Sequence, residues 1–413
     1  MADFGASDLE TFRAEVDAWL AANYPAELRA PKANTDPEAV WGGRAFAGSD
    51  DPQIVWMRRA AAKGWTAPTW PTAFGGGGLS ADQARVVNKA IADAGCGPPV
   101  MSFGLWMLGP VLLEYASEAQ KAEHLPKITG GEIRWCQGYS EPGAGSDLAS
   151  LQTKCEDKGD HWLINGQKIW TSYANKADWC FCLVRTDTTK KHEGISFVLI
   201  DMTTPGVETR PIKLISGDSP FCETFFTDVK IPKGNMVGQL NGGWEIAKRL
   251  LQYERQNISG GFGAGGGAGG LAGDLGQIAA RYVGLDETGA LADADLRGRI
   301  TKNKMDFQSF YLTLSRVAAE SRASNGPSAA TSIIKYAAAT LAQERSELMV
   351  EAMGHQGLGW EGEDFAPLEI AATRSWLRSK GKSIEGGTSE VNINVVSKRV
   401  LGLPDPKPAG SKS

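Results

Sequence analysis

The spacing of hydrophobic residues predicts helical ends around a middle of short strands. Between residues 1 and 130, apolar positions repeat three and four residues apart, as in amphipathic helices. Three Ser residues followed at the third position by Glu or Gln have the pattern of a capping box, which starts a helix. They are Ser7, Ser80 and Ser117. A further helix is predicted over residues 52–63, beginning at a Pro.

From Gly130 to about Gly238 the pattern changes to short runs of β-branched and aromatic residues separated by Gly, Asn or Asp. These runs predict strands at residues 133–136, 151–155, 179–184, 195–200 and 221–226. An apolar run at 162–164 followed by Asn165-Gly166 has the signature of a hairpin. We therefore expect a small antiparallel barrel or sandwich.

Helical spacing returns at residue 243. Helices are predicted at about 244–254 and on into the Gly-rich run 260–273, then at 292–324, 328–353, 367–380 and 389–401. Each Gly weakens a helix by up to about 1 kcal/mol relative to Ala, so the Gly-rich run is either a closely packed helix or an interruption. The order of elements predicts an α+β fold with three domains, at 1–130, 131–240 and 241–413.

Composition narrows the function classes. The 413 residues carry a net charge of −5, which argues against a nucleic-acid surface. The most apolar run, 100–113, is too short and too interrupted to span a membrane. Four scattered His residues predict no metal site, and six Cys residues without paired spacing indicate a reducing cytoplasm. Cys180 and Cys182 alternate on a predicted strand, which suggests core packing.

A glycine-rich loop offers candidate chemistry. Residues 139–147 read Tyr-Ser-Glu-Pro-Gly-Ala-Gly-Ser-Asp, which is incompatible with a helix or a central strand because of Pro142 and the two glycines. Amides and hydroxyls in such a loop can cradle a phosphate or a flavin. The alternative is a tight surface turn.

Two further motifs make the loop more specific. Residues 166–173 read Gly-Gln-Lys-Ile-Trp-Thr-Ser-Tyr, and residues 387–390 read Gly-Thr-Ser-Glu. Together with the loop, and in this order, they resemble the acyl-CoA dehydrogenase family over nearly the whole chain. The resemblance implies an N-terminal helical domain, a middle antiparallel β-barrel and a C-terminal helical bundle.

The resemblance also implies a reaction. A carboxylate removes the α-proton of an acyl-CoA thioester, and the β-hydrogen leaves as hydride to N5 of FAD, which gives the 2-enoyl-CoA. Electrons would pass to an electron-transfer flavoprotein. The family leads us to expect a homotetramer or homodimer.

Individual residues carry over from the family's motifs. The positions that match flavin contacts are Gln137, Tyr139, Ser140, Gly145, Ser146, Trp170, Ser172, Gly354, Thr388 and Glu390. The positions that match substrate contacts are Ser146, Arg255 and Gly386.

The catalytic base departs from the commoner family pattern. Many members place a Glu immediately before Gly-Thr in the C-terminal turn, where this chain has Gly386. A minority place it in a Glu-Arg pair on the central helix, and Glu254-Arg255 matches that arrangement. We therefore expect Glu254 to be the base; Glu385, one residue from the commoner position, is a weaker candidate. The alternative is that Glu254 is a surface residue paired with an Arg.

Other departures leave alternatives open. Glu351, Gly354 and His355 fall where a neighbouring subunit usually contacts FAD, although Gln is commoner at the first position and Gly at the last. Arg281 matches only loosely an Arg that reaches the partner's FAD. The chain could instead be a non-catalytic partner subunit of a heteromeric dehydrogenase, or an oxidase or desulfinase-type relative.

Overall fold

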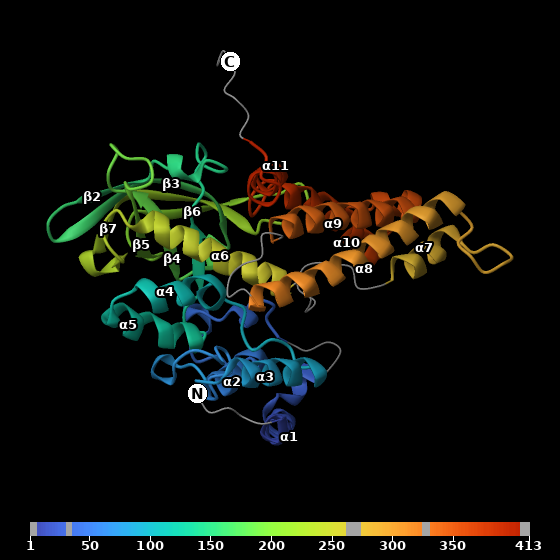
Figure 1. Cartoon of the computed structure of the whole chain (residues 1–413), viewed down its shortest axis with the longest axis horizontal. Coiled ribbons are helices and arrows are strands. Elements are labelled where there is room, and N and C mark those ends of the chain that lie inside the picture. The colour runs from blue at the N-terminus through green and yellow to red at the C-terminus, as the bar shows by residue number, and fades with distance from the viewer. Residues whose placement is uncertain (1–5, 30–34, 262–273, 324–330, 405–413) are drawn as a thin grey trace, which may run out of the picture. The chain divides into compact units, whose positions relative to one another are not determined.

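The computed structural model describes residues 6–29, 35–261, 274–323 and 331–404. They form two compact units, and Figure 1 labels most of their helices and strands. Unit 1 comprises Met1–Ile212 and Pro220–Glu254, and unit 2 comprises Lys213–Ser219 and Arg255–Ser413. The helices and the large sheet confirm the α+β fold class. The domain limits at 130 and 240 stay predictions.

In the described part of unit 1, five α-helices precede the sheet. They are α1 (Ala6–Asn23), α2 (Pro52–Ala62), α3 (Ala81–Asp93), α4 (Gly109–Tyr115) and α5 (Glu118–Thr129). The capping boxes at Ser80 and Ser117 are confirmed, because each hydroxyl accepts the N–H of the Gln three residues later and that Gln side chain bonds back. The capping box at Ser7 is wrong, since α1 already includes Ala6.

Eight strands form one sheet in unit 1. They are β1 (Trp135–Gly138), β2 (Lys154–Asp157), β3 (His161–Ser172), β4 (Trp179–Arg185), β5 (Ile195–Asp201), β6 (Val207–Ile212), β7 (Phe221–Pro232) and β8 (Met236–Val237). Their order is β6-β7-β3-β2-β4-β5-β8, and β1 pairs with β4. Most pairs are antiparallel, but β1 and β2 run parallel to β4.

Both faces of the central strands are buried, which explains their nearly continuous apolar sequence. On β4, Phe181 and Leu183 face one apolar cluster, which also contains residues of α4, α5 and α6 (Gly243–Gly261). Cys180 and Cys182 face the other cluster, between β1, β3, β5 and β7. The predicted core packing of the two cysteines is thereby confirmed.

The predicted hairpin at Asn165-Gly166 is wrong, because β3 continues through it. The backbone turns back earlier, between Asp157 and His161. Gly166 has φ +154°, and a Cβ there would lie 2.7 Å from Cα of Thr153 on the chain leading into β2. The register opposite β7 shifts at this point, so the Gly belongs to a bulge inside a long strand.

Unit 2 is helical. Its helices are α7 (Leu275–Val283), α8 (Ala294–Ala323), α9 (Thr331–Met353), α10 (Pro367–Ser379) and α11 (Ser389–Val395). Figure 1 shows α7, α8, α9 and α10 side by side, and apolar residues from all four pack in one core. The predicted helix over the Gly-rich run reaches Gly261, and the remainder, 262–273, lies outside the described residues. Within the ranges given above, no helix is both long and apolar enough to cross a membrane.

Candidate active site

The segment after β1 is held by a buried ion pair. Lys168 of β3 is completely buried, and its Nζ lies 2.7 Å from Oε1 of Glu141, which is only 8% exposed. The same Nζ donates to the carbonyl of Tyr139 at 3.2 Å. Next to it, the N–H of Ile169 donates to the carbonyl of Ser140 at 2.9 Å. The main chain of residues 139–141 is thus attached to β3.

Glu141 also holds the chain that follows the loop. Its Oε2 accepts the N–H of Gln152 at 2.6 Å, and its Oε1 accepts that of Thr153 at 2.9 Å. Burial by itself raises the pKa of Glu141, but the charge of Lys168 and these hydrogen bonds outweigh it, so the pKa is lowered overall. The carboxylate is therefore ionised at neutral pH.

The outer part of the loop is open to solvent. Gly145 and Ser146 are exposed, and a Cβ placed on Gly145 would meet no atom within 4 Å. Asp147 forms an exposed ion pair with Lys191 at 2.8 Å. This part of the loop can accept a ligand against its amides and hydroxyls.

Trp170 is presented at an irregularity near the end of β3. The register opposite β7 shifts between Lys168 and Thr171, and Trp170 has φ +60°. Its side chain is 52% exposed, although the other Trp of this strand, Trp162, is buried. Its ring meets Phe221 edge-on at 6.0 Å. A bulky residue in the left-handed region costs free energy, and such strain is concentrated at functional sites.

The predicted residues on β3, on β1 and directly after β1 differ in exposure. Gln137, Ser140 and Ser172 are half-buried. Tyr139 is buried, with its ring edge-on to Phe181 at 6.1 Å. Among the described residues, no group hydrogen-bonds to its hydroxyl. The hydroxyl is therefore a candidate hydrogen-bonding group for a ligand.

Glu254 lies on α6 and is half-buried. Burial raises the pKa of the Tyr139 phenol well above its ordinary value, and the Glu254 carboxylate raises it further. Tyr139 and Leu250, one helical turn before Glu254 on α6, belong to the same apolar cluster, so Glu254 and the end of β1 lie in the same part of unit 1. Arg255 continues the helix, and its side chain is not among those described.

The remaining predicted residues belong to unit 2. Gly354 follows α9 with φ +56°, and Gly386 has φ +62°. Thr388 caps α11, because its hydroxyl accepts the N–H of Val391 at 3.1 Å. Glu390 is exposed in the first turn of that helix.

Two weaker candidates in unit 2 are engaged in ion pairs. Glu385 bonds to Arg378 at 2.6 Å, and Glu351 bonds to Arg299 at 2.6 Å. These pairs occupy the carboxylates in structural contacts. The Arg281 guanidinium lies over the ring of Tyr282 at 5.8 Å.

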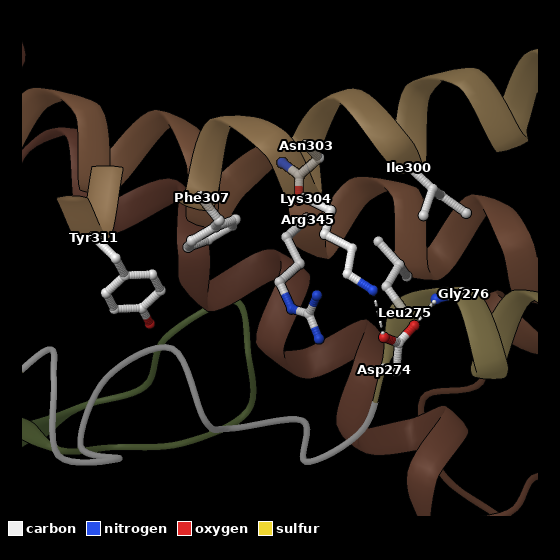
Figure 2. A pocket seen from close by; sticks show the side chains of 9 residues that line it. All are labelled: Asp274, Leu275, Gly276, Ile300, Asn303, Lys304, Phe307, Tyr311 and Arg345. Carbon is white, nitrogen blue, oxygen red and sulfur yellow. Dashed lines mark hydrogen bonds and ion pairs between the residues drawn. The ribbon is translucent and has the colours of Figure 1, made fainter. Parts of the chain in front are cut away.

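A cavity of about 330 Å³ lies elsewhere in unit 2. Figure 2 shows Phe307, Tyr311 and Arg345 projecting towards the same space, with Lys304 bonded to Asp274. None of the predicted site residues lines it. Asp274, on one wall, directly follows residues 262–273, which lie outside the described ranges. We therefore assign no ligand to this cavity. Across the described ranges, no group of three His, Cys, Asp or Glu side chains could hold a metal ion.

The sequence analysis missed Lys168 and Glu141 as site-building residues. Both stood inside quoted motifs, Lys two residues before Trp170 and Glu directly before Pro142. The available signal was the charge of Lys168 on a strand that was expected to be largely buried. Such a residue is buried only when it is paired.

Comparison with known proteins shows one family along the chain. Residues 7–132, 136–229 and 241–401 match the N-terminal, middle and C-terminal domains of acyl-CoA dehydrogenases. Acyl-CoA dehydrogenase IpdE1 of Mycolicibacterium smegmatis is 35% identical over 409 residues, covering 96% of this chain and 98% of that protein.

Solved structures agree with this relationship. A chain of the ChsE4–ChsE5 complex from Mycobacterium tuberculosis is 26% identical with a TM-score of 0.72, covering 98% of this chain and 100% of that one. A chain of Tcur3481–Tcur3483, a steroid ACAD, is 25% identical with a TM-score of 0.73 and the same coverage. The relatives' names support an oxidoreductase that dehydrogenates acyl-CoA. The chain belongs to the acyl-CoA dehydrogenase family.

Proposed function

We propose that this chain is an FAD-dependent acyl-CoA dehydrogenase that forms a 2-enoyl-CoA, with Glu254 as the base that takes the α-proton. The observation that carries the proposal is Trp170. Its indole is about half exposed on a strained backbone, and its ring lies edge-on to Phe221. A flat ligand packed on the indole would explain why the strain is kept.

The other residues predicted to contact the flavin have suitable chemistry. Ser140 and Ser172 are half-buried hydroxyls, Gly145 leaves open space, and the buried hydroxyl of Tyr139 has no partner among the described residues. Polar groups around an aromatic surface are what binds and orients an isoalloxazine ring. Bound FAD supplies the two-electron acceptor for the β-hydrogen. Ser146 and the loop amides would hold FAD and the pantetheine of the substrate.

Glu254 suits the role of base because it is half-buried beside an apolar cluster on α6. A partly desolvated carboxylate binds a proton more readily than one in water, which favours abstraction of a weakly acidic α-proton. Gly386 replaces the carboxylate of the commoner arrangement and keeps a main-chain N–H. We assign that N–H to the thioester carbonyl, where it would stabilise the charge that develops.

The acyl group is proposed to carry rings. Partly buried aromatic residues form a cluster in unit 1. The ring centre of Trp41 lies 5.5 Å from that of Phe103 and 5.3 Å from that of Tyr173, the residue after Ser172. Flat apolar side chains suit a rigid, ring-bearing group. One relative at 25% identity is a steroid ACAD. Straight-chain acyl-CoAs are then expected to be poorer substrates.

The assembly has two candidate forms. We propose a homotetramer or homodimer that passes electrons to an electron-transfer flavoprotein in the cytoplasm. The second candidate is a heteromer in which this chain is one of two kinds of subunit. It is favoured by Gly386 and by the two-component names ChsE4–ChsE5 and Tcur3481–Tcur3483.

One assay separates these functions. The purified chain is given ring-bearing, branched and straight-chain acyl-CoAs, and reduction of a ferrocenium acceptor without oxygen is compared with oxygen consumption in air. A dehydrogenase reduces ferrocenium, and an oxidase consumes oxygen without added acceptor. Activity found only after co-expression with a second acyl-CoA dehydrogenase chain would replace the homomeric proposal by the heteromeric one.

A further inference from the structure

We propose that Lys168 and Glu141 form the positioning element of the flavin site, setting the main-chain geometry of residues 139–141 and thereby the affinity for FAD. This inference rests on the proposed function, because it assumes that these residues contact a flavin. It assigns Lys168 and Glu141 a positioning role and no contact with the reacting atoms.

The ion pair joins the two segments that are proposed to contact the flavin. Lys168 Nζ bonds to both Glu141 and the Tyr139 carbonyl, and Trp170 follows Lys168 by two residues on the same strand. The hydrogen bond from Ile169 N–H to the Ser140 carbonyl lies between them. A displacement of Lys168 would therefore change the spacing between the loop and the strand that carries Trp170.

Glu141 fixes the far side of the same segment. Besides Lys168, its carboxylate accepts the N–H groups of Gln152 and Thr153. Its own main chain exchanges two hydrogen bonds of 2.9 Å with Ala144, which closes the Pro-Gly turn. Each end of the loop is thus tied through this one side chain.

Stability alone does not explain this arrangement. Removing two charges from water costs several kcal/mol per ion, and replacing a buried ion pair by apolar groups is often neutral or stabilising. A geometric role is a sufficient reason to keep the pair, because two charge-assisted bonds orient a main-chain segment more narrowly than apolar packing does.

The loop supplies its own matched control. Asp147 of the loop forms a second ion pair with Lys191, which lies between β4 and β5, and both side chains are more than half exposed to solvent. Exposed pairs contribute little to stability. Breaking the exposed pair changes the charge of the loop as much as breaking the buried one and leaves residues 139–141 attached.

The experiment compares four variants with the wild type: Lys168→Met, Glu141→Gln, the double variant, and Lys191→Met. Apoproteins are prepared, FAD dissociation constants are measured by quenching of flavin fluorescence, and stability is measured by urea unfolding of the same apoproteins. The visible spectrum of bound flavin provides a second readout. If the Lys168 variants do not fold, the FAD dissociation constant and stability of Glu141→Gln, which keeps the shape of the side chain, test the proposal.

We expect each single buried variant to lose stability and to bind FAD at least about tenfold more weakly, since a hydrogen bond to a charged group is lost. In the double variant stability should return, because no unpaired charge remains, while FAD binding stays weak. Lys191→Met should bind FAD within about twofold of the wild type.

Two results would overturn the proposal. One is wild-type FAD affinity in Lys168→Met or Glu141→Gln. The other is a double variant in which affinity recovers together with stability, which would show a purely structural role. A wild-type protein that binds no FAD would instead remove the proposed function, and this proposal with it.

Discussion

Arg249 on α6 is bonded to Glu114 on α4, with Nη2 2.7 Å from Oε1. The hydroxyl of Tyr253, which precedes Glu254, donates to the same carboxylate and lies 2.8 Å from Arg249 Nη2. The bond to Arg249 lowers the pKa of Glu114, and burial together with Glu114 raises the pKa of Tyr253 to about 12. This cluster holds the helix turn that carries the proposed base.

Replacing Glu114 by Gln should therefore affect catalysis more than stability. The ion pair is about one-third exposed, so we expect a stability loss of about 1 kcal/mol or less. The rate of α-proton removal should fall several-fold, because Glu254 is less well oriented. Stopped-flow reduction of the flavin measures this rate. Lys248→Met breaks the exposed Lys248–Glu245 pair on the same helix and is the control. Equal rates in the Glu114 variant and the wild type would contradict this role of Glu114.

Trp170 and Trp162 lie on the same strand and should respond differently to truncation. Trp162→Ala removes a buried ring, with an expected stability loss of about 3–5 kcal/mol. Trp170→Ala should cost much less stability than Trp162→Ala, because its ring is half exposed and the backbone strain is the same for Trp and Ala, since Ala also has a Cβ. Loss of a stacked ring should weaken FAD binding about three- to tenfold. FAD titration of the apoprotein checks this, and unchanged affinity would mean that the indole does not pack on flavin.

His124 should make stability depend on pH. It is buried 5.5 Å from Trp135 and 5.0 Å from Trp179, measured between rings. Burial lowers its pKa, which Glu123 partly opposes and Lys127 reinforces. The unfolded chain therefore takes up a proton below pH 6.5 that the folded chain does not. Stability should fall as the pH drops from 6.5 towards the folded pKa, by at most about 1.4 kcal/mol per pH unit.

The test compares urea unfolding at pH 7.0 and pH 5.5. His124→Phe keeps an aromatic ring among the tryptophans and should lose less stability than the wild type over this range. His161→Phe, at a partly exposed position, is the control and should keep the wild-type difference. An identical pH response in wild type and His124→Phe would rule out His124 as its source.

Features that depend on residues close together in the sequence could be predicted from the sequence. The helix starts at Ser80 and Ser117 follow from bonds between residues three apart. The hairpin at Asn165-Gly166 failed because a long ladder with β7 outweighs the local turn preference, and Gly166 serves a bulge instead.

The candidate site was readable only as a set of motifs. The pairing of Lys168 with Glu141 joins residues 27 apart, and it depends on how β3 lies beside the segment after β1. The burial of the Tyr139 ring likewise depends on packing from β4 and β5. Such relationships are set by strand register, which periodicity alone does not define.

The most direct test of the proposed chemistry is an anaerobic titration with acyl-CoAs while the visible band of the flavin is recorded. Wild type, Glu254→Gln and Glu385→Gln are compared, each reconstituted with FAD. We predict that a suitable acyl-CoA bleaches the band in wild type and Glu385→Gln, and that bleaching in Glu254→Gln is slower by at least about 100-fold, as expected for loss of a general base. Bleaching of Glu254→Gln at the wild-type rate would contradict the account.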